Sequence, residues 1–208
     1  MPKKPSLSPP ERILAAAFNE FATHRFETAS TNQIAKEAKV AKGLLFHYFK
    51  SKEELFLTVF ARTAASMSET FWTLLQGTPK DLFEKLRHWS VLRLKMVQRD
   101  PKLYHFMSMA LTDCPPQIKP KIMLMLEPIQ TRAWGELMRD VDTSKLRSGV
   151  TMQQAIEVLM IFSAGLEQRM SAVMAATPDH GLSMLEALTK QVHDYLELIR
   201  DGLYQAPA

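Results

Sequence analysis

The chain has 208 residues, of which 46% are hydrophobic and 23% are charged, as is ordinary for a folded protein with a sizeable core. It contains only 7 glycines and no regular series of short β-branched segments, so the composition favours an all-α fold. Its single cysteine, Cys114, excludes an internal disulfide. The amino-terminal MPKKPSLSPP lacks the apolar stretch of an export signal, and the most apolar run, residues 155–166, is too short to span a bilayer. We therefore expect a soluble, cytoplasmic protein with no membrane contact.

Positive charge is concentrated in the first quarter of the chain. Residues 1–52 contain nine Lys or Arg and four Asp or Glu, a difference of +5, whereas the remaining residues contain 17 and 18, a difference of −1. This bias predicts that the first quarter meets a polyanion. A basic amino terminus without such a role is the alternative.

The first predicted helix begins after Ser8, which is the expected N-cap. Pro9 suits the first turn, and Glu11 closes a capping box with Ser8. Apolar residues then recur at helical spacing: Ile13, Leu14, Ala17, Phe18 and Phe21. Phe26 is expected to enter the core where the chain turns.

Two short helices and a long one follow. Ser30 and Gln33 form a second capping box at the start of a helix of barely two turns. The next helix is expected from about Ala41 to Phe49, and a third capping box at residues 51–54 starts a long fourth helix. Two short helices joined by a tight turn and packed on a longer one form a helix-turn-helix unit.

The segment KVAKGLLFHYFKSKEEL, residues 39–55, indicates which helix would enter DNA. In a helix-turn-helix unit the second short helix enters the major groove by its amino-terminal end. Lys42 and Gly43 stand at that end, where glycine permits a close approach of the backbone. Leu45 and Phe49 are expected to face the core. Four residues are expected to face outward, at least in part: Leu44, Phe46, His47 and Tyr48.

The aromatic residues of this helix have a second interpretation as ordinary core residues, which suits Phe49 better than Tyr48. No two histidines lie four residues apart with a carboxylate nearby, so the sequence predicts no metal site and no cofactor.

The segment FETASTNQIAKEAKVAKGLLFHYFKSKEELF resembles the DNA-binding signature of the TetR family of bacterial transcriptional regulators. The resemblance extends from about Glu11 to Phe60 and rests on the lysine, the glycine, the aromatic pair and K-S-K-E-E-L in register. Together with the helix pattern it implies a three-helix DNA-binding domain at 1–52 and a helical ligand-binding and dimerisation domain at 53–208. A helix at about 52–75 would link the two, with about nine helices in all.

The resemblance also implies individual contacts with DNA. Residues expected to touch bases or the groove are Asn32, Lys42, Gly43, Leu44 and Phe46. Residues expected to touch phosphates are Ser30, Thr31, His47, Tyr48 and Lys52.

Four positions depart from the family pattern. The family usually has glycine where Lys39 stands, in a turn that tends to need a positive φ, so the same backbone would strain Lys39 by about 1 kcal/mol. Ala41 replaces a common capping serine, so the third helix would lack a cap. Phe46 lacks the hydroxyl of a frequent tyrosine. Leu44, in place of threonine or serine, favours apolar contact with a thymine methyl group.

The rest of the chain divides into five predicted helices by its proline and glycine positions. They cover residues 80–98, 102–112, 121–141, about 151–176 and 181–203, and Pro128 is expected either to kink or to restart the third of them.

The last two helices carry patterns of an association surface. Ser163 and Gly165 belong to a group of small residues that would let another helix cross closely. Apolar residues of the last helix recur at spacings of three and four: Leu185, Leu188, Val192, Tyr195 and Ile199. Each pattern alone also fits plain core packing. A two-fold dimer explains them better, because one helix-turn-helix unit fits one half-site, and the resemblance implies a four-helix bundle of these helices.

Methionine and aromatic residues crowd the helices between residues 80 and 141. The proposed lining of an effector pocket is Trp89, Arg93, Phe106, Met109, Met125 and Trp134. The same residues fit a simple core, and the expected pocket rests on the resemblance. The sequence does not choose a polar anchor among His88, Arg93, His105 and Arg132.

The sequence therefore predicts a homodimeric transcriptional regulator, a repressor that a small apolar effector releases from a palindromic double-stranded operator. The alternative is a helical carrier of hydrophobic molecules with a vestigial helix-turn-helix, against which the basic bias and the intact Lys42, Gly43, Tyr48 and Lys52 argue. An enzyme is the third reading, but no nucleophile–base pair or paired carboxylates occur at a suitable spacing.

Overall fold

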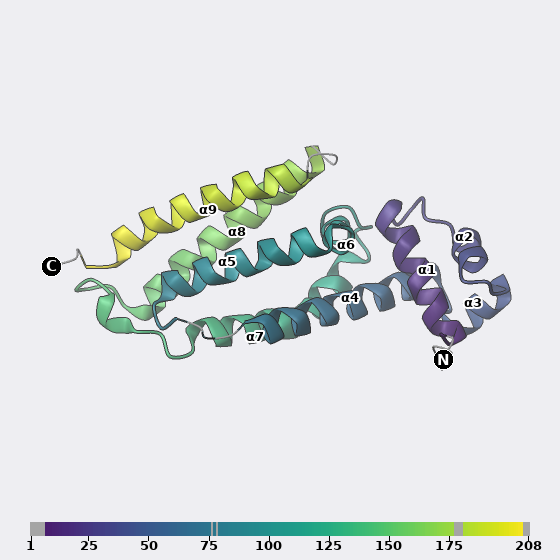
Figure 1. Ribbon diagram of the computed structural model, residues 1–208, viewed down its shortest axis with the longest axis horizontal. Coiled ribbons are helices and arrows are strands. Elements are labelled where there is room, and N and C mark those ends of the chain that lie inside the picture. Colours follow the sequence, from purple (N-terminus) through teal and green to yellow (C-terminus); the bar gives the residue numbers. More distant parts are fainter. Residues whose placement is uncertain (1–6, 76, 78, 177–180, 206–208) are drawn as a thin grey trace, which may run out of the picture. The chain divides into compact units, whose positions relative to one another are not determined.

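The computed structural model describes residues 7–75, 77, 79–176 and 181–205. Within them it contains nine α-helices, a 3₁₀ turn and no β-strand (Figure 1), which confirms the predicted all-α fold. The elements are α1 Pro9–Thr23, α2 Thr31–Glu37, α3 Lys42–Tyr48, α4 Lys52–Leu74, α5 Leu82–Arg99, α6 Pro101–Thr112, α7 Lys119–Met138, η1 Thr143–Lys145, α8 Met152–Ala176 and α9 Gly181–Leu203. Each of these helices is too short or too polar to cross a membrane.

Local signals in the sequence account for where several helices begin. The Glu11 carboxylate accepts hydrogen bonds from the amide and hydroxyl of Ser8 at 2.9 and 2.8 Å, which confirms the first capping box. Asp81 is the N-cap of α5, and its side chain accepts from amides in the first turn of that helix. Pro128 lies inside α7, which continues through it, so the proline does not restart the helix.

Contacts divide the chain into two compact units. The first contains residues 1–69 and 101–130, and the second contains residues 70–100 and 131–208. The first three helices therefore share a unit with α6, with most of α4 and with the first part of α7.

Aromatic rings join the helices of the first unit. Phe106 of α6 is fully buried, and its ring lies edge-on to Phe18 of α1 at 5.5 Å and to Phe56 of α4 at 5.9 Å. The Phe56 ring also meets Phe21 at 5.0 Å and Phe26 at 5.2 Å, so Phe26 enters the core as predicted. Such ring pairs add about 0.5–1.5 kcal/mol each beyond the area they bury.

In the second unit α5 lies along α9 (Figure 1). Phe83 meets Tyr204 edge-on at 5.0 Å, over a core that also contains Leu159 and Leu196. Lys85 is only 2% exposed, and its Nζ donates to the backbone carbonyls of residues 137 and 139 at the end of α7. Burial lowers the pKa of this amine.

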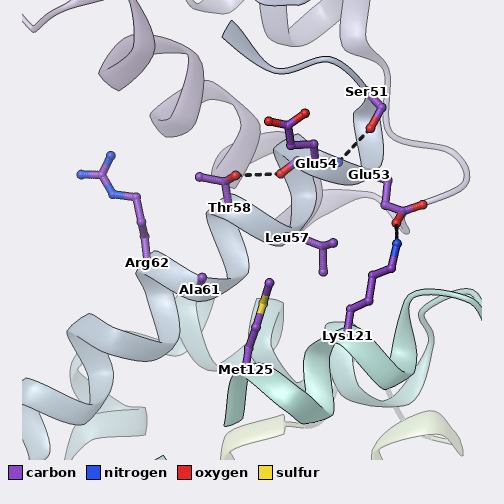
Figure 2. Close-up of a pocket in the computed structure, with 9 residues that line it drawn as sticks. All are labelled: Ser51, Glu53, Glu54, Leu57, Thr58, Ala61, Arg62, Lys121 and Met125. Carbon is purple, nitrogen blue, oxygen red and sulfur yellow. Dashed lines mark hydrogen bonds and ion pairs between the residues drawn. The ribbon is translucent and has the colours of Figure 1, made fainter. Parts of the chain in front are cut away.

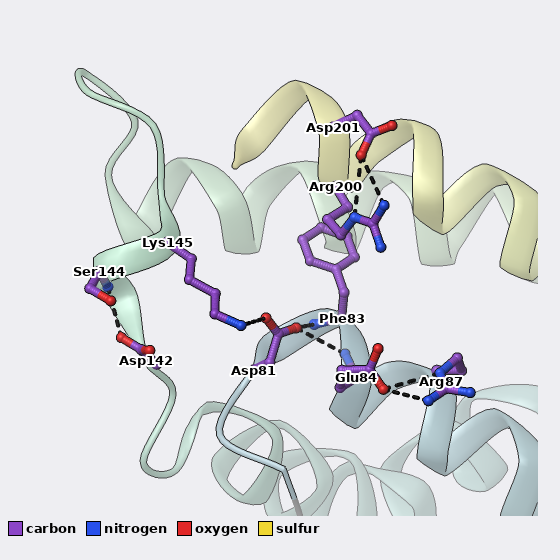
Figure 3. A network of polar contacts seen from close by, with 9 residues as sticks. All are labelled: Asp81, Phe83, Glu84, Arg87, Asp142, Ser144, Lys145, Arg200 and Asp201. Atoms are coloured by element: carbon purple, nitrogen blue, oxygen red, sulfur yellow. Dashed lines mark hydrogen bonds and ion pairs between the residues drawn. The ribbon is translucent and has the colours of Figure 1, made fainter. Parts of the chain in front are cut away.

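Figure 3 shows polar contacts that hold the start of α5 to the segment after α7. The Asp81 carboxylate accepts from the amides of Phe83 and Glu84 at 2.9 and 3.0 Å and from Lys145 Nζ at 2.8 Å. Burial alone would raise the pKa of the Asp81 carboxyl, but these hydrogen bonds outweigh it and hold that pKa below its usual range. The ion pair therefore reinforces a corner that is also closed by a backbone hydrogen bond from the Asp142 amide to the Lys80 carbonyl at 2.9 Å.

The turn between α2 and α3 contains a lysine in the left-handed backbone region. Lys39 has a φ of 55°, which confirms the strained conformation predicted for this position. A residue with a Cβ pays about 1 kcal/mol or more there, whereas glycine does not.

We expect Lys39→Gly to raise the free energy of unfolding by about 0.5–1 kcal/mol, because relief of the strain exceeds the added entropy of the unfolded chain. Urea denaturation of the whole protein measures the change. Lys36→Gly, inside α2, is the control and should lower the free energy of unfolding by about 1 kcal/mol. A Lys39→Gly protein less stable than the wild type would contradict the assignment of strain.

Candidate nucleic-acid interface

α3 has one face in the core and one face exposed. Leu45 is fully buried and Phe49 is 7% exposed, so these two residues hold α3 against the first unit, as predicted. The four residues expected to face outward are half-buried or exposed: Leu44, Phe46, His47 and Tyr48. Tyr48 is 40% exposed and is thus accessible to a partner.

The amino-terminal end of α3 is open. Lys42 and Gly43 are both exposed, and a Cβ added to Gly43 would meet no atom within 4 Å. The packing of the chain therefore does not require glycine at this position. The Lys42 Nζ lies 6.0 Å from the ring centre of Phe46, and Ala41 gives α3 no side-chain cap, as expected. The free amide groups of this end point to a partner that accepts hydrogen bonds.

Exposed lysines lie before, in and after α3. Four lysines of the α2–α3 region are exposed: Lys36, Lys39, Lys42 and Lys50. Glu37 is an exposed acid of the same region, and its Oε1 is 2.6 Å from Asn19 Nδ2 of α1. Positive charge therefore dominates the surface around α3, as a polyanion partner requires.

The start of α2 is held differently from the sequence prediction. The Ser30 hydroxyl accepts from the Gln33 amide at 3.3 Å, as a capping box requires. The Ser30 amide, however, donates to Glu20 of α1 at 2.7 Å, so Gln33 is the wrong partner for it. The other residues expected to touch DNA at this end, Thr31 and Asn32, are half-buried and exposed respectively. The sequence missed Glu20 because a contact across ten residues leaves no local pattern.

Lys52 is engaged within the protein. Its Nζ donates to the Glu27 carbonyl at 3.0 Å and lies 4.9 Å from the ring centre of Phe26. Burial lowers the pKa of the Lys52 amine, and the Glu27 and Glu20 carboxylates oppose that effect. A phosphate contact by Lys52 stays a prediction.

The residues predicted to line an effector pocket fall in both units. Phe106, Met109 and Met125 belong to the first unit, and Trp89, Arg93 and Trp134 belong to the second. Phe106 is a fully buried core residue, whereas Arg93 is exposed. Neither unit by itself brings the six residues together.

A shallow cavity of about 470 Å³ lies between α4 and α7 in the first unit (Figure 2). Leu57, Ala61 and Met125 form its apolar part. Lys121 pairs with Glu53 at its rim. The cavity is too open to enclose a small molecule. Of the residues predicted to line an effector pocket, only Met125 borders it.

A more compact aromatic cluster lies in the second unit. Phe71, Trp72 and Trp89 meet edge-to-face with ring centres 5.0–5.7 Å apart. The Arg132 guanidinium lies 4.6 Å from the centre of the Trp72 ring. The Trp89 indole N–H is buried without a hydrogen-bond partner in the described part of the chain. The sequence named Trp89 and Arg132 but missed Phe71 and Trp72, which stand at the end of a helix assigned to linking the domains.

The residues predicted for a dimer surface also differ in placement. Gly165 is exposed and Ser163 is half-buried. Val192 and Ile199 pack against the core of their own unit, and Tyr195 meets Phe162 at 6.2 Å. The side chains of Leu185 and Leu188 lie outside the described part of α9.

The described residues contain no group of three or more His, Cys, Asp or Glu side chains placed to hold a metal ion.

Comparison with known proteins agrees with this geometry. Residues 13–59 match the family model described as "Bacterial regulatory proteins, tetR family". The HTH-type transcriptional repressor AcnR of Corynebacterium glutamicum is 29% identical over 186 residues, which cover 83% of this chain and 86% of that protein. The probable acrEF/envCD operon repressor of Escherichia coli K12 is 24% identical over half of each chain. The fold of Bacillus subtilis FadR, solved in complex with stearoyl-CoA, matches with a TM-score of 0.61, 21% identity and coverage of 89% and 96%.

An open, cation-rich helix-turn-helix on an all-α scaffold defines the class: a DNA-binding transcriptional regulator. Residues 13–59 carry the part of the chain that matches the tetR family, and the whole chain resembles regulators of that kind in sequence and fold.

We expect Lys42→Ala and Tyr48→Ala each to weaken DNA binding by about 1–3 kcal/mol while fold and assembly persist, because both side chains are exposed. Fluorescence anisotropy against labelled duplex at several salt concentrations measures the loss. Lys42→Ala should also reduce the salt slope by about 1 if this lysine neutralises a phosphate.

Lys95→Ala is the matched control, because Lys95 is an exposed lysine of α5, which belongs to the second unit. Unchanged binding in both α3 variants would remove α3 from the interface.

Proposed function

We propose that the protein is a homodimeric repressor that reads a palindromic operator with α3 and leaves it when a small effector binds. The observation that carries this proposal is the open amino-terminal end of α3, where a Cβ on Gly43 would meet no atom of the described residues within 4 Å. In this proposal residues 1–52 read DNA, α4 links, and residues 53–208 bind the effector and dimerise. Catalysis has no place in it, since the named relatives are regulators. Its place of action is the cytoplasm, where bacterial DNA lies.

The proposed contacts follow from exposure. Lys42, Gly43 and Asn32 reach the groove, together with Leu44 and Phe46 at its wall. Phosphate oxygens are bound by exposed or half-buried donors at helix ends, namely Ser30, Thr31, His47, Tyr48 and Lys52. The sequence-independent part of the affinity would come from the lysines.

The proposed dimer surface uses the outward face of α8. Val158, Ile161 and Gly165 share that face and are exposed, Ile161 at 74%. Leu198 of α9 is 70% exposed. Large apolar side chains with such exposure favour burial against a second copy. Gly165 would let the partner helix approach closely.

Charge on this surface should prevent dimerisation. We expect Ile161→Glu and Leu198→Glu to yield folded monomers, because each would bury an unpaired carboxylate in the interface. Light scattering after size exclusion measures the mass. Val91→Glu, at an exposed apolar position of α5, is the control and should stay dimeric. A charge at Val192 should instead destabilise the fold, since Val192 packs against the core. A dimer that survives both outward substitutions would place the interface elsewhere.

The effector site that the side chains support best is the aromatic cluster of Phe71, Trp72 and Trp89. The Arg132 guanidinium lies over the Trp72 ring, and its N–H donors can bind a planar anion. The unpartnered Trp89 N–H is a second donor. The effector would therefore join an apolar body to an anionic group. Stearoyl-CoA, the ligand of the FadR structure with this fold, has the same two parts.

This effector class predicts a selective response. At equal chain length, octanoate should bind more tightly than 1-octanol or octylamine and should release the operator duplex. Arg132→Gln should weaken octanoate about tenfold, since hydrogen bonds to charged groups contribute about 1.5–3 kcal/mol. Tryptophan fluorescence measures binding, and anisotropy of labelled operator measures release. Arg93→Gln, another exposed arginine of the second unit, is the control.

Equal binding of the three probes, or octanoate binding that leaves operator affinity unchanged, would contradict this assignment. The operator affinity of each protein is also measured without octanoate on the same duplex. A defect in DNA binding is thereby separated from a defect in effector binding.

A further inference from the structure

The corner between α1 and α2 contains a buried carboxylate that the proposed DNA contacts do not use. Glu20 is only 7% exposed, and its Oε1 lies 2.7 Å from the amide nitrogen of Ser30. Ser30 is the N-cap of α2, so the amide in question lies just before the helix and has no partner within it. A capping-box side chain three residues later usually serves that amide. Here a residue of another helix serves it.

Further contacts surround the same carboxylate. His24 Nδ1 lies 3.5 Å from Glu20 Oε1, one turn along α1. Lys52, the first residue of α4, feels the Glu20 charge and donates to the Glu27 carbonyl at 3.0 Å. The corner is thus held from α1 by a carboxylate and from α4 by an ammonium group. Ser30 lies between these two anchors along the chain.

We propose that Glu20 is a positioning residue for operator binding, an inference that rests on the proposed function. Its carboxylate fixes the first turn of α2 through the Ser30 amide, and it thereby sets where the Ser30 and Thr31 donors meet phosphate. A negative charge at a helix start also favours the helix itself. Because α2 has only seven residues, it depends on such tertiary contacts for its placement.

The competing explanation is that Glu20 only stabilises the fold. The two differ in what happens to a folded variant. Glu20→Gln keeps the length of the side chain and an acceptor oxygen for the Ser30 amide. Glu20→Asp keeps the charge but is one methylene too short. Glu20→Leu fills the volume but accepts no hydrogen bond.

The test compares operator affinity, Ser30 amide exchange and the unfolding midpoint in the full-length protein. We expect Glu20→Leu and Glu20→Asp to lose about tenfold in operator affinity, to exchange the Ser30 amide faster and to keep the salt slope. Glu20→Gln should restore most of the affinity. Glu69→Leu, which removes the same charge from an exposed site on α4 of the same unit, should not weaken binding.

Wild-type affinity in folded Glu20→Leu, or equal affinities of the Asp and Gln variants, would overturn the positioning role. If Glu20→Leu fails to fold, the comparison of Asp with Gln decides alone. A wild-type protein that binds no duplex at low salt would refute the proposed function instead, so the two failures are distinguishable.

Discussion

Phe106 of α6 is the buried residue on which the placement of α2 and α3 depends. Its ring touches α1 through Phe18 and α4 through Phe56, so α1, α4 and α6 share one aromatic centre. α2 and α3 have seven residues each, too few for stable isolated helices. They take their orientation from α1, against which both pack. A displacement of α6 would therefore act on α1 first, and on α2 and α3 through their packing against α1.

Polar contacts link α6 to the same helices at both ends. Arg25 pairs with Asp113 at 2.9 Å just beyond the end of α6, and Lys102 in its first turn donates to Asn19, which in turn donates to Glu37 of α2. These groups are mostly solvent-accessible, and exposed ion pairs contribute only about 0–1 kcal/mol each. Loss of a buried phenylalanine costs about 3–5 kcal/mol. The aromatic centre therefore contributes more than the polar contacts to holding α6 against α1.

Local sequence signals predicted most of the helices, whereas contacts between distant segments could not be predicted from the sequence. Capping boxes, proline and glycine positions and apolar spacing are read within a few residues, so the start of α1 at Ser8 and the buried face of α3 at Leu45 agree with the sequence. The Glu20–Ser30 contact and the aromatic cluster around Trp72 join distant segments, and periodicity does not encode which helices become neighbours. The same limit applies to α9, where an apolar seam that also fits core packing is assigned from the sequence to a dimer surface. Val192 and Ile199 pack inward.

Lys39 and Gly43 each differ from the residue that would make the free protein more stable, and the proposed DNA contact would account for both. Lys39 adopts a φ of 55°, where glycine would be free of strain, and Gly43 occupies a helix where alanine would fit and would be more favourable by about 1 kcal/mol. Neither choice helps the free protein. A lysine in the turn places an additional exposed cation beside α3, and a glycine at the start of α3 leaves its backbone without a side chain that would hinder a close approach. The strain at Lys39 and the lower helix propensity of Gly43 both lie on the surface that we propose binds DNA.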